Sequence, residues 1–208
     1  FYRTLECRSE KIRYIHNENI GYGASHNIAI RESIDMGAKY HVVLNPDIYF
    51  QDGTIETIAQ YMDNNEDVGQ IMPKVFYPNG DLQYLCKMIP NPVDLIFKRF
   101  LPSKLIENRL YKFQLRFTGY DKIMNVPYLS GCFMFFRVSA LKQVGLFDER
   151  FFMYPEDIDI TRRMHRLYKT VFYPYASIVH EHAAASKTNK RMLKIHILNM
   201  IKYFNKWG

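Results

Sequence analysis

Apolar residues in the first part of the chain occur in short runs that alternate with stripes of helical spacing. Runs rich in β-forming residues predict strands at 12–15, 40–44 and 68–72. Apolar positions three and four residues apart predict helices at 24–36 and 54–64. A strand–helix–strand–helix–strand order is typical of a parallel sheet covered by helices, so the pattern predicts an α/β fold.

The pattern changes after Pro73. Turn-forming residues at 77–81 predict a hairpin tip. Residues 94–117 are basic and aromatic and contain helical stretches, and residues 126–136 are β-prone. We expect a helix from Pro155 to Leu167 and strands at 170–173 and 177–179. A basic amphipathic helix is expected at 190–204. We therefore expect one domain over residues 1–208, with a basic helical insertion at 86–122 and a basic helix within 186–208.

The composition supports a single compact domain. The 208 residues include 48% hydrophobic residues and carry a net charge of +7, a balance that excludes a disordered chain. No apolar run approaches the roughly 18 to 20 residues of a membrane span. Three cysteines without a CxxC spacing imply neither a disulfide framework nor a zinc site. A reducing, cytoplasmic setting fits this usage best.

The positive charge is confined to two segments. Residues 86–122 contain eight Lys and Arg against three acids, and residues 186–208 contain six Lys and Arg and no acid. The remainder of the chain is mildly acidic. Such segments suit phosphate-rich partners, namely nucleic acid, anionic lipid or a diphosphate-bearing substrate, although solvated surface explains them equally well.

Asp47 follows the predicted strand at 40–44, where ligand-binding residues gather in an α/β sheet. Its carboxylate could hold a divalent cation that neutralises phosphate oxygens. A turn-forming role after Pro46 is the alternative.

Three carboxylates, on Glu156, Asp157 and Asp159, lie in the first turn of a predicted helix. The helix dipole favours acids there, but capping needs one acid and three repel one another. They also follow an aromatic stretch at 147–154. One of them could therefore act as a general base in a cleft, and ion pairs with Arg162 and Arg163 are the structural alternative.

Other candidates carry weaker signals. His180 follows a short apolar strand, Gly21 permits close backbone approach to a ligand, and the Ser130–Gly131 pair interrupts a β-prone segment. Each of them also fits a structural role.

Four segments occur in an order and at separations that resemble a known family. They are Asn19–Asn27 around two glycines, Leu44–Asp47, Tyr128–Met134, and the long stretch from Gly145 to Asp159. Together they resemble the family 2 glycosyltransferases of bacteria, in particular the rhamnosyltransferase-like branch that builds O-antigen and capsule chains.

The resemblance implies a GT-A fold, in which helices flank a mixed and mostly parallel sheet. It also implies a nucleotide-diphosphate-sugar donor and Mg²⁺ or Mn²⁺. By the same resemblance Asp47 binds metal and diphosphate, with His180 as a further metal ligand. Asp157 matches the catalytic base, and Glu156 its neighbour in the acceptor site. The donor-binding positions are Gly21, Asn27, Asn45, Asp47, Ser130 and Gly131.

The leading hypothesis is an inverting transferase that moves a sugar, with rhamnose as a guess, to a glycan or undecaprenyl-diphosphate-linked acceptor in envelope polysaccharide synthesis. The chain would act in the cytoplasm, with peripheral contact to the inner face of the plasma membrane through its basic segments. Nucleic acid is not expected as a partner, and the sequence leaves an oligomer open.

One departure from the family supports an alternative. Nothing before Ile12 matches the family's nucleotide-base-binding segment, so we expect an N-terminally incomplete domain. A non-catalytic nucleotide-sugar-binding or scaffold fragment is therefore the alternative function.

Overall fold

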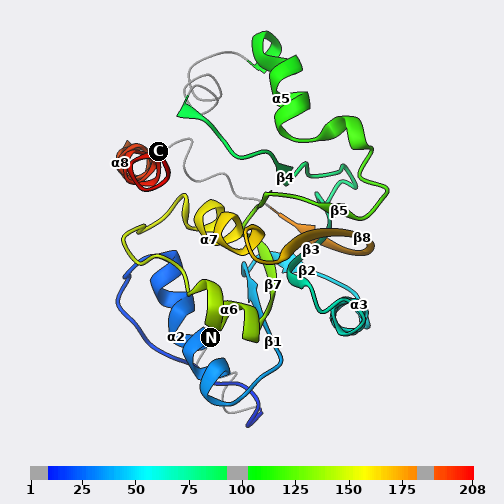
Figure 1. Ribbon diagram of the computed structural model, residues 1–208, viewed down its shortest axis with the longest axis vertical. Coiled ribbons are helices and arrows are strands. Elements are labelled where there is room, and N and C mark those ends of the chain that lie inside the picture. Colours follow the sequence, from blue (N-terminus) through cyan, green and yellow to red (C-terminus); the bar gives the residue numbers. More distant parts are fainter. Residues whose placement is uncertain (1–8, 93–102, 182–189) are drawn as a thin grey trace.

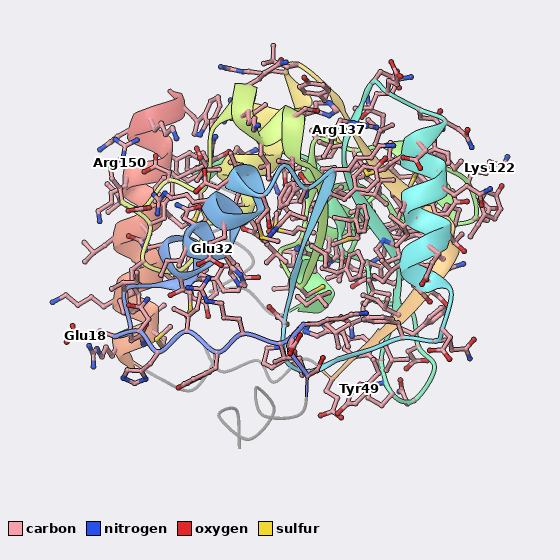
Figure 2. All side chains as sticks on the ribbon, turned by 90° about the horizontal axis from the view of Figure 1, so that it is seen from below. Glu18, Glu32, Tyr49, Lys122, Arg137 and Arg150 are labelled. Atoms are coloured by element: carbon pink, nitrogen blue, oxygen red, sulfur yellow. The ribbon has the colours of Figure 1, made fainter. Side chains whose placement is uncertain are left out.

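The computed structural model describes residues 9–92, 103–181 and 190–208. A central sheet separates two layers of helices (Figure 1). Helices α2 (Tyr22–Asp35), α6 (Val138–Val144) and α7 (Glu156–His165) pack on one face, and α3 (Thr54–Asp63) packs on the other. Side chains fill the interior between these layers (Figure 2).

The main sheet has the order β1-β7-β3-β8-β2, with β5 also paired to β8. The strands are β1 (Tyr40–Leu44), β2 (Ile48–Tyr49), β3 (Val68–Phe76), β5 (Met124–Asn125), β7 (Phe133–Arg137) and β8 (Lys169–His180). Strand β7 is antiparallel to both β1 and β3, and β3 is parallel to β8. Strands β1, β3 and β8 therefore run in the same direction, which confirms a mixed sheet flanked by helices.

Alternation along the strands divides the core between the two faces. Val43 and Met134 face α2, α6 and α7, whereas Phe133 and Phe135 belong to the cluster that includes α3. This division fixes the register of β1 on β7, because a one-residue slip would turn Val43 to the opposite face of the sheet and away from its own core cluster.

Several element boundaries differ from the predictions. Residues 12–15 form no strand, and the two strands predicted at 170–173 and 177–179 are one strand, β8. The break that we predicted between these two strands is a shift in the pairing of β8 with β3, which occurs between Pro73 and Lys74 of β3. Pro155 precedes α7 instead of beginning it. The other predicted strands and helices of the core begin within two residues of their expected positions, whereas β2 and α6 were not predicted.

A small second sheet pairs β4 (Cys86–Lys87) with β6 (Tyr128–Leu129) and carries the insertion. Between these strands lie the 3-10 helices η1 (Ser103–Ile106) and η2 (Arg116–Thr118), on either side of α5 (Glu107–Phe113). The buried Tyr120 hydroxyl lies 2.9 Å from the Cys86 carbonyl and 2.7 Å from the Gln114 carbonyl. It therefore ties the end of the insertion to β4. The division of the chain into one domain with a basic helical insertion at 86–122 stays a prediction.

Helix α8 (Lys190–Trp207) packs against α7 through Met200 and Tyr203. The indole of Trp207 donates a hydrogen bond to the buried Asp159 at 2.9 Å, and the Lys202 ammonium donates one to the backbone of Arg150. The predicted basic C-terminal helix is thus one of the supports of α7. Within the described ranges, no helix combines the length and apolar character needed to span a bilayer.

Candidate active site

Asp157, in the first turn of α7, lies at the centre of the candidate site. Its Oδ2 atom accepts hydrogen bonds from the Gly131 amide at 3.1 Å and the Tyr128 hydroxyl at 3.2 Å. Its Oδ1 atom accepts one from the Ile158 amide at 2.8 Å. A Cβ atom on Gly131 would lie 3.0 Å from the Cβ of Asp157, so a glycine allows this close approach. Strand β6 and the turn after it therefore fix the carboxylate in place.

Lys87 adds a positive charge beside this carboxylate. Its ammonium donates a hydrogen bond to Ser130 at 2.6 Å and lies 4.8 Å from the centre of the Tyr128 ring. Burial raises the pKa of Asp157, and the charge of Lys87 together with the three hydrogen bonds opposes that rise. Lys87 was not predicted as a site residue, because its charge was assigned to the basic insertion. Its position inside the apolar run at 85–89 was a usable signal.

Glu156 precedes Asp157 and is buried, with 6% of its surface exposed. Burial and the adjacent charge of Asp157 raise the pKa of Glu156 to about 8. Its Oε2 atom has no hydrogen-bond partner among the described residues. Both carboxyl groups therefore hold a proton more tightly than an exposed carboxyl group does, and Glu156 carries its proton at neutral pH.

Tyr22 brings the segment after β1 next to the Ser130–Gly131 turn. Its hydroxyl donates a hydrogen bond to the Gly131 carbonyl at 2.7 Å and lies 3.3 Å from the Asn45 side-chain oxygen. The backbone N–H of Asn45 donates a hydrogen bond to the Cys132 carbonyl at 2.9 Å. Burial and the neighbouring acids Glu156 and Asp157 raise the pKa of Tyr22, so its hydroxyl stays protonated. Three of the predicted donor-binding residues, Asn45, Ser130 and Gly131, thus lie around Asp157.

Asp47 and His180 form a second group. The His180 Nε2 atom lies 3.5 Å from an Asp47 carboxylate oxygen, and its Nδ1 atom lies 3.0 Å from the Gln83 amide oxygen. The Gln83 amide also donates to the His180 carbonyl at 2.6 Å, which holds the ring against β3. Because the Gln83 oxygen can only accept, Nδ1 carries the proton of the neutral ring, and in that form Nε2 is available as a ligand on the side of Asp47.

This donor set fits a divalent cation that is shared with a substrate. The described residues contain no group of three or more His, Cys, Asp or Glu arranged as a complete metal site. Mg²⁺, however, commonly takes one or two protein ligands and fills its shell with phosphate oxygens and water. Asp47 and His180 would supply such a pair.

Two other predicted donor-binding residues make structural contacts. The Asn27 side chain exchanges hydrogen bonds with the Phe147 backbone, at 2.9 and 3.0 Å. Gly21 has φ 104° and ψ 163°, and a Cβ atom there would lie 2.4 Å from the Phe152 carbonyl oxygen. Both residues attach the 145–154 loop to α2. Their contact with a donor stays a prediction.

Asp159, the third acid of the cluster, has a structural role. It is fully buried and accepts from Arg163 at 2.9 Å, Lys206 at 2.7 Å and Trp207 at 2.9 Å. Of the three acids, only Glu156 and Asp157 remain for chemistry.

A mixed sheet flanked by helices, with a carboxylate fixed at the start of a helix and an Asp–His pair at the end of a strand, is the arrangement expected of a GT-A glycosyltransferase. The sequence profile described as glycosyltransferase-like family 2 matches residues 3–195, and the chain belongs to that family. The crystal structure of S. aureus TarS 1-349 has the same GT-A fold, with a TM-score of 0.50 and 14% identity, over 80% of this chain and 42% of that one.

Among curated proteins, the chain is similar to two Mycobacterium tuberculosis proteins, from strains CDC 1551 and H37Rv. Both are named N-acetylglucosaminyl-diphospho-decaprenol L-rhamnosyltransferase, and each is 26% identical over 178 residues. The match covers 79% of this chain and 57% of each relative, so the chain spans little more than half the length of these relatives.

Proposed function

We propose that this chain is the catalytic part of an inverting glycosyltransferase of envelope polysaccharide synthesis. It would move L-rhamnose from a nucleotide-diphosphate donor to a lipid-linked, diphosphate-bearing acceptor. The observation that carries the proposal is the Asp157 carboxylate, held by Gly131 and Tyr128 beside a protonated Glu156.

Asp157 is the general base in this proposal. The acceptor hydroxyl oxygen forms a bond to the anomeric carbon while the bond from that carbon to the donor diphosphate breaks. The hydroxyl proton passes to Asp157, and the electron pair of the broken bond leaves with the diphosphate. Attack opposite the leaving group inverts the configuration, so no covalent intermediate with the protein is needed.

Glu156 and Tyr22 complete the proposed site. In this proposal the protonated Glu156 adds no second negative charge beside the base. The Tyr22 hydroxyl contacts both Asn45 and Gly131, which keeps these two proposed donor-side residues side by side.

Asp47 and His180 lie on the donor side of the proposed site. A bound Mg²⁺ or Mn²⁺ would neutralise the charge that develops on the departing diphosphate. Lys87, with its ammonium at Ser130, supplies a further positive charge near the donor. Asn45, Ser130 and Gly131 border the space for the donor sugar, and Gly21 and Asn27 shape the loop beside it.

The choice of sugar and acceptor rests on the relatives. The two mycobacterial proteins are named for L-rhamnose transfer to a diphospho-decaprenol-linked N-acetylglucosamine. A polyprenyl-diphosphate acceptor also agrees with the positive charge of the insertion and of α8.

Peripheral membrane contact is a second part of the proposal, through the exposed face of α8. Ile197, Leu198 and Ile201 are each about half exposed on that face, and Lys194 and Lys202 lie among them. Apolar residues between lysines are typical of a helix that lies on an anionic bilayer. An Ile197→Asn, Ile201→Asn double variant should lose co-sedimentation with anionic vesicles, whereas a matched Leu167→Asn variant should keep it.

The proposed activity is tested with an Asp157→Asn variant of the native protein. Transfer from a panel of nucleotide sugars to a lipid-linked acceptor should fall by about 10²- to 10⁴-fold, the usual contribution of a general base. Asp121→Asn, on the exposed surface of the insertion, is the matched control and should retain full turnover. Full turnover in Asp157→Asn would refute the base. Nucleotide-sugar binding without any turnover in the wild type would favour the non-catalytic alternative.

A further inference from the structure

Helix α8 binds the 145–154 loop, which leads into α7 (Figure 1). The Asn199 side-chain amide donates a hydrogen bond to the Met153 carbonyl at 2.8 Å, and the Lys202 ammonium donates one to the Arg150 carbonyl at 3.1 Å. Two side chains on successive turns of α8 therefore hold the backbone of this loop.

Asn199 is a buried polar residue beside an apolar cluster. Only 3% of its surface is exposed, and its neighbour Met200 packs with Phe151 and Ile158. Burying an amide is unfavourable unless the amide is hydrogen-bonded, so an apolar side chain would suit this position if packing were its only role. The residue type therefore indicates that the hydrogen bond to the loop is specific.

The backbone of Tyr154, the next residue of the loop, is in the left-handed region with φ 53°. A residue with a side chain keeps this conformation only where its surroundings hold it. Helix α8 supplies two such contacts. Asn199 binds the carbonyl of the preceding Met153, and the ring of His196 lies 4.7 Å from the ring of Tyr154, measured between their centres.

Helix α2 binds the same loop one residue earlier. The Tyr22 backbone N–H donates a hydrogen bond to the Phe152 carbonyl at 2.9 Å. Two consecutive carbonyls of the loop, those of Phe152 and Met153, therefore bind two different helices. Removing the α8 contact would leave the loop attached to α2 alone at this point of the chain.

The loop ends at the first turn of α7, which carries Asp157. The Pro155 carbonyl accepts a hydrogen bond from the Asp159 backbone N–H at 3.0 Å, so the position of Pro155 sets the start of this helix. Asn199 binds the backbone two residues before Pro155. It is therefore connected to the Asp157 carboxylate through a short stretch of chain.

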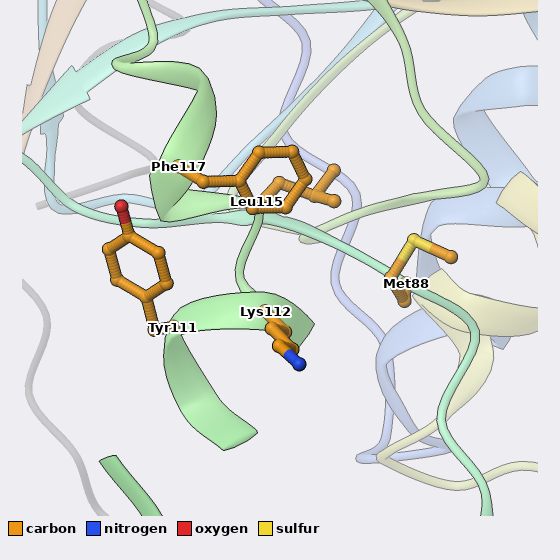
Figure 3. A pocket seen from close by; sticks show the side chains of 5 residues that line it. All are labelled: Met88, Tyr111, Lys112, Leu115 and Phe117. Carbon is orange, nitrogen blue, oxygen red and sulfur yellow. The ribbon is translucent and has the colours of Figure 1, made fainter. Parts of the chain in front are cut away.

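The apolar cluster at α8 also includes Ile89, just beyond β4. Met88, between Lys87 and Ile89, lies on the other side of this extended segment. There it lines an apolar hollow with Tyr111, Lys112, Leu115 and Phe117 (Figure 3). The hollow is thus turned away from α8 and Asp157, and the contacts that reach the base come from the α8 side.

We propose that Asn199 is a positioning residue of the transferase, which holds the 145–154 loop so that Asp157 is directed at the acceptor hydroxyl. The inference rests on the proposed function, which makes Asp157 the base. Asn199 acts through the loop and not on a reacting atom. Without its amide, Tyr154 relaxes and the first turn of α7 moves away from Gly131 and Tyr128, the two groups outside α7 that bind the carboxylate.

The first experiment measures amide hydrogen exchange of the native protein and needs no turnover. In Asn199→Leu, which removes the donor and keeps a side chain of similar size, peptides that cover the 145–154 loop and the start of α7 should exchange about 2- to 10-fold faster, the effect of one lost hydrogen bond. Peptides from β1, β3 and β8 should not change. Asn205→Leu is the matched control, because Asn205 is an exposed asparagine of the same helix, and it should leave all of these peptides unchanged.

Unchanged exchange of the loop in Asn199→Leu would overturn the proposal. Faster exchange over the whole sheet would also overturn it, because α8 would then support the fold in general. If Asn199→Leu does not fold, Asn199→Ala removes the same donor without adding volume, and the same outcomes decide. Loss of folding in both variants counts as general support of the fold.

The second experiment measures kcat against pH, with a nucleotide sugar and a lipid-linked acceptor in detergent. Asn199→Leu should lower kcat by about 10- to 100-fold, the usual effect of a misplaced catalytic group. The acid limb should also move to higher pH, because a displaced Asp157 loses part of the hydrogen bonds that favour its ionised form. The variant keeps the titratable neighbours of this carboxylate, namely Glu156, Lys87, Tyr128, Tyr22, Cys132 and Tyr203.

A protein that is only less folded loses kcat without moving the acid limb, so a lower kcat with an unmoved limb would make Asn199 a structural residue and overturn the proposal. Asp157→Asn separates this result from a failure of the proposed function. Full turnover in Asp157→Asn would refute the base and the positioning role together. An inactive Asp157→Asn with unchanged loop exchange in Asn199→Leu would refute the positioning role alone.

Discussion

The Lys87 ammonium lies 2.6 Å from the Ser130 hydroxyl oxygen and so brings a positive charge to the turn that holds Asp157. Two residues 43 positions apart in sequence therefore set the electrostatics of the proposed base. Lys87 lowers the pKa of Asp157 against the effect of burial. The basic insertion thus contributes to the site as well as to the surface.

Replacing Lys87 with Met should raise the pKa of Asp157. Because the base acts only when ionised, the acid limb of the pH profile of kcat/KM should move to higher pH. We expect the loss of kcat/KM to be larger at low pH than at high pH, because the substitution changes the fraction of Asp157 that is ionised. Lys122→Met, an exposed lysine of the same insertion on the far side of the molecule from α8 (Figure 2), should leave the profile unchanged. A uniform loss at every pH would mean that Lys87 acts through substrate binding alone.

The pKa of Glu156 predicts a pH-dependent stability. Its folded-state value of about 8 lies above its ordinary value of 4.5, so the folded protein binds an additional proton between these pH values. Stability should therefore fall as pH rises from about 4.5 to about 8, by an amount on the order of a few kcal/mol. Glu156→Gln, which cannot ionise, should flatten this dependence and unfold at a higher temperature than the wild type at pH 9. Parallel thermal-unfolding curves for the two proteins across this range would contradict the assignment.

The strands and the position of Asp157 could be read from the sequence because they depend on local patterns. Runs of β-forming residues mark 40–44 and 68–72, and acids after an aromatic stretch mark the start of α7. The strand predicted at 12–15 was wrong, since a short apolar run alone does not guarantee a pairing partner. Strand β7 lies antiparallel between β1 and β3, and this placement depends on long-range contacts that the local sequence does not predict.

The same limit explains the site residues that were missed. Lys87, Tyr22, Tyr128 and Gln83 contribute through contacts over 29 to 109 positions in sequence. Asn27 was predicted to bind the donor, and the structure shows an amide engaged by the Phe147 backbone. A sequence motif gives the residue type at a position. It does not show whether that side chain contacts a ligand or holds a loop in place.

Gly21 should be intolerant of any side chain. Its φ of 104° and ψ of 163° lie in a region that is essentially restricted to glycine, and a Cβ would meet the Phe152 carbonyl oxygen. Gly80, at a turn with φ 87°, has nothing within 4 Å of its Cβ position, so Gly80→Ala reports backbone strain alone, about 1–2 kcal/mol. We expect Gly21→Ala to cost about 1–3 kcal/mol more, measured by denaturant unfolding. Equal costs would show that the 145–154 loop moves away without penalty.

The Asp47–His180 pair should bind a divalent cation only together with a diphosphate. Two protein ligands leave most of the coordination shell to phosphate oxygens and water, so Mn²⁺ alone should bind weakly. Electron paramagnetic resonance should show bound Mn²⁺ when the nucleotide diphosphate is added. The Asp47→Asn variant should lose that signal. The Asp52→Asn variant, which changes an exposed aspartate, is the control and should retain it. His180→Gln should weaken the signal less than Asp47→Asn, since it removes a neutral ligand and keeps the carboxylate. Undiminished Mn²⁺ binding in Asp47→Asn would place the metal elsewhere in the protein.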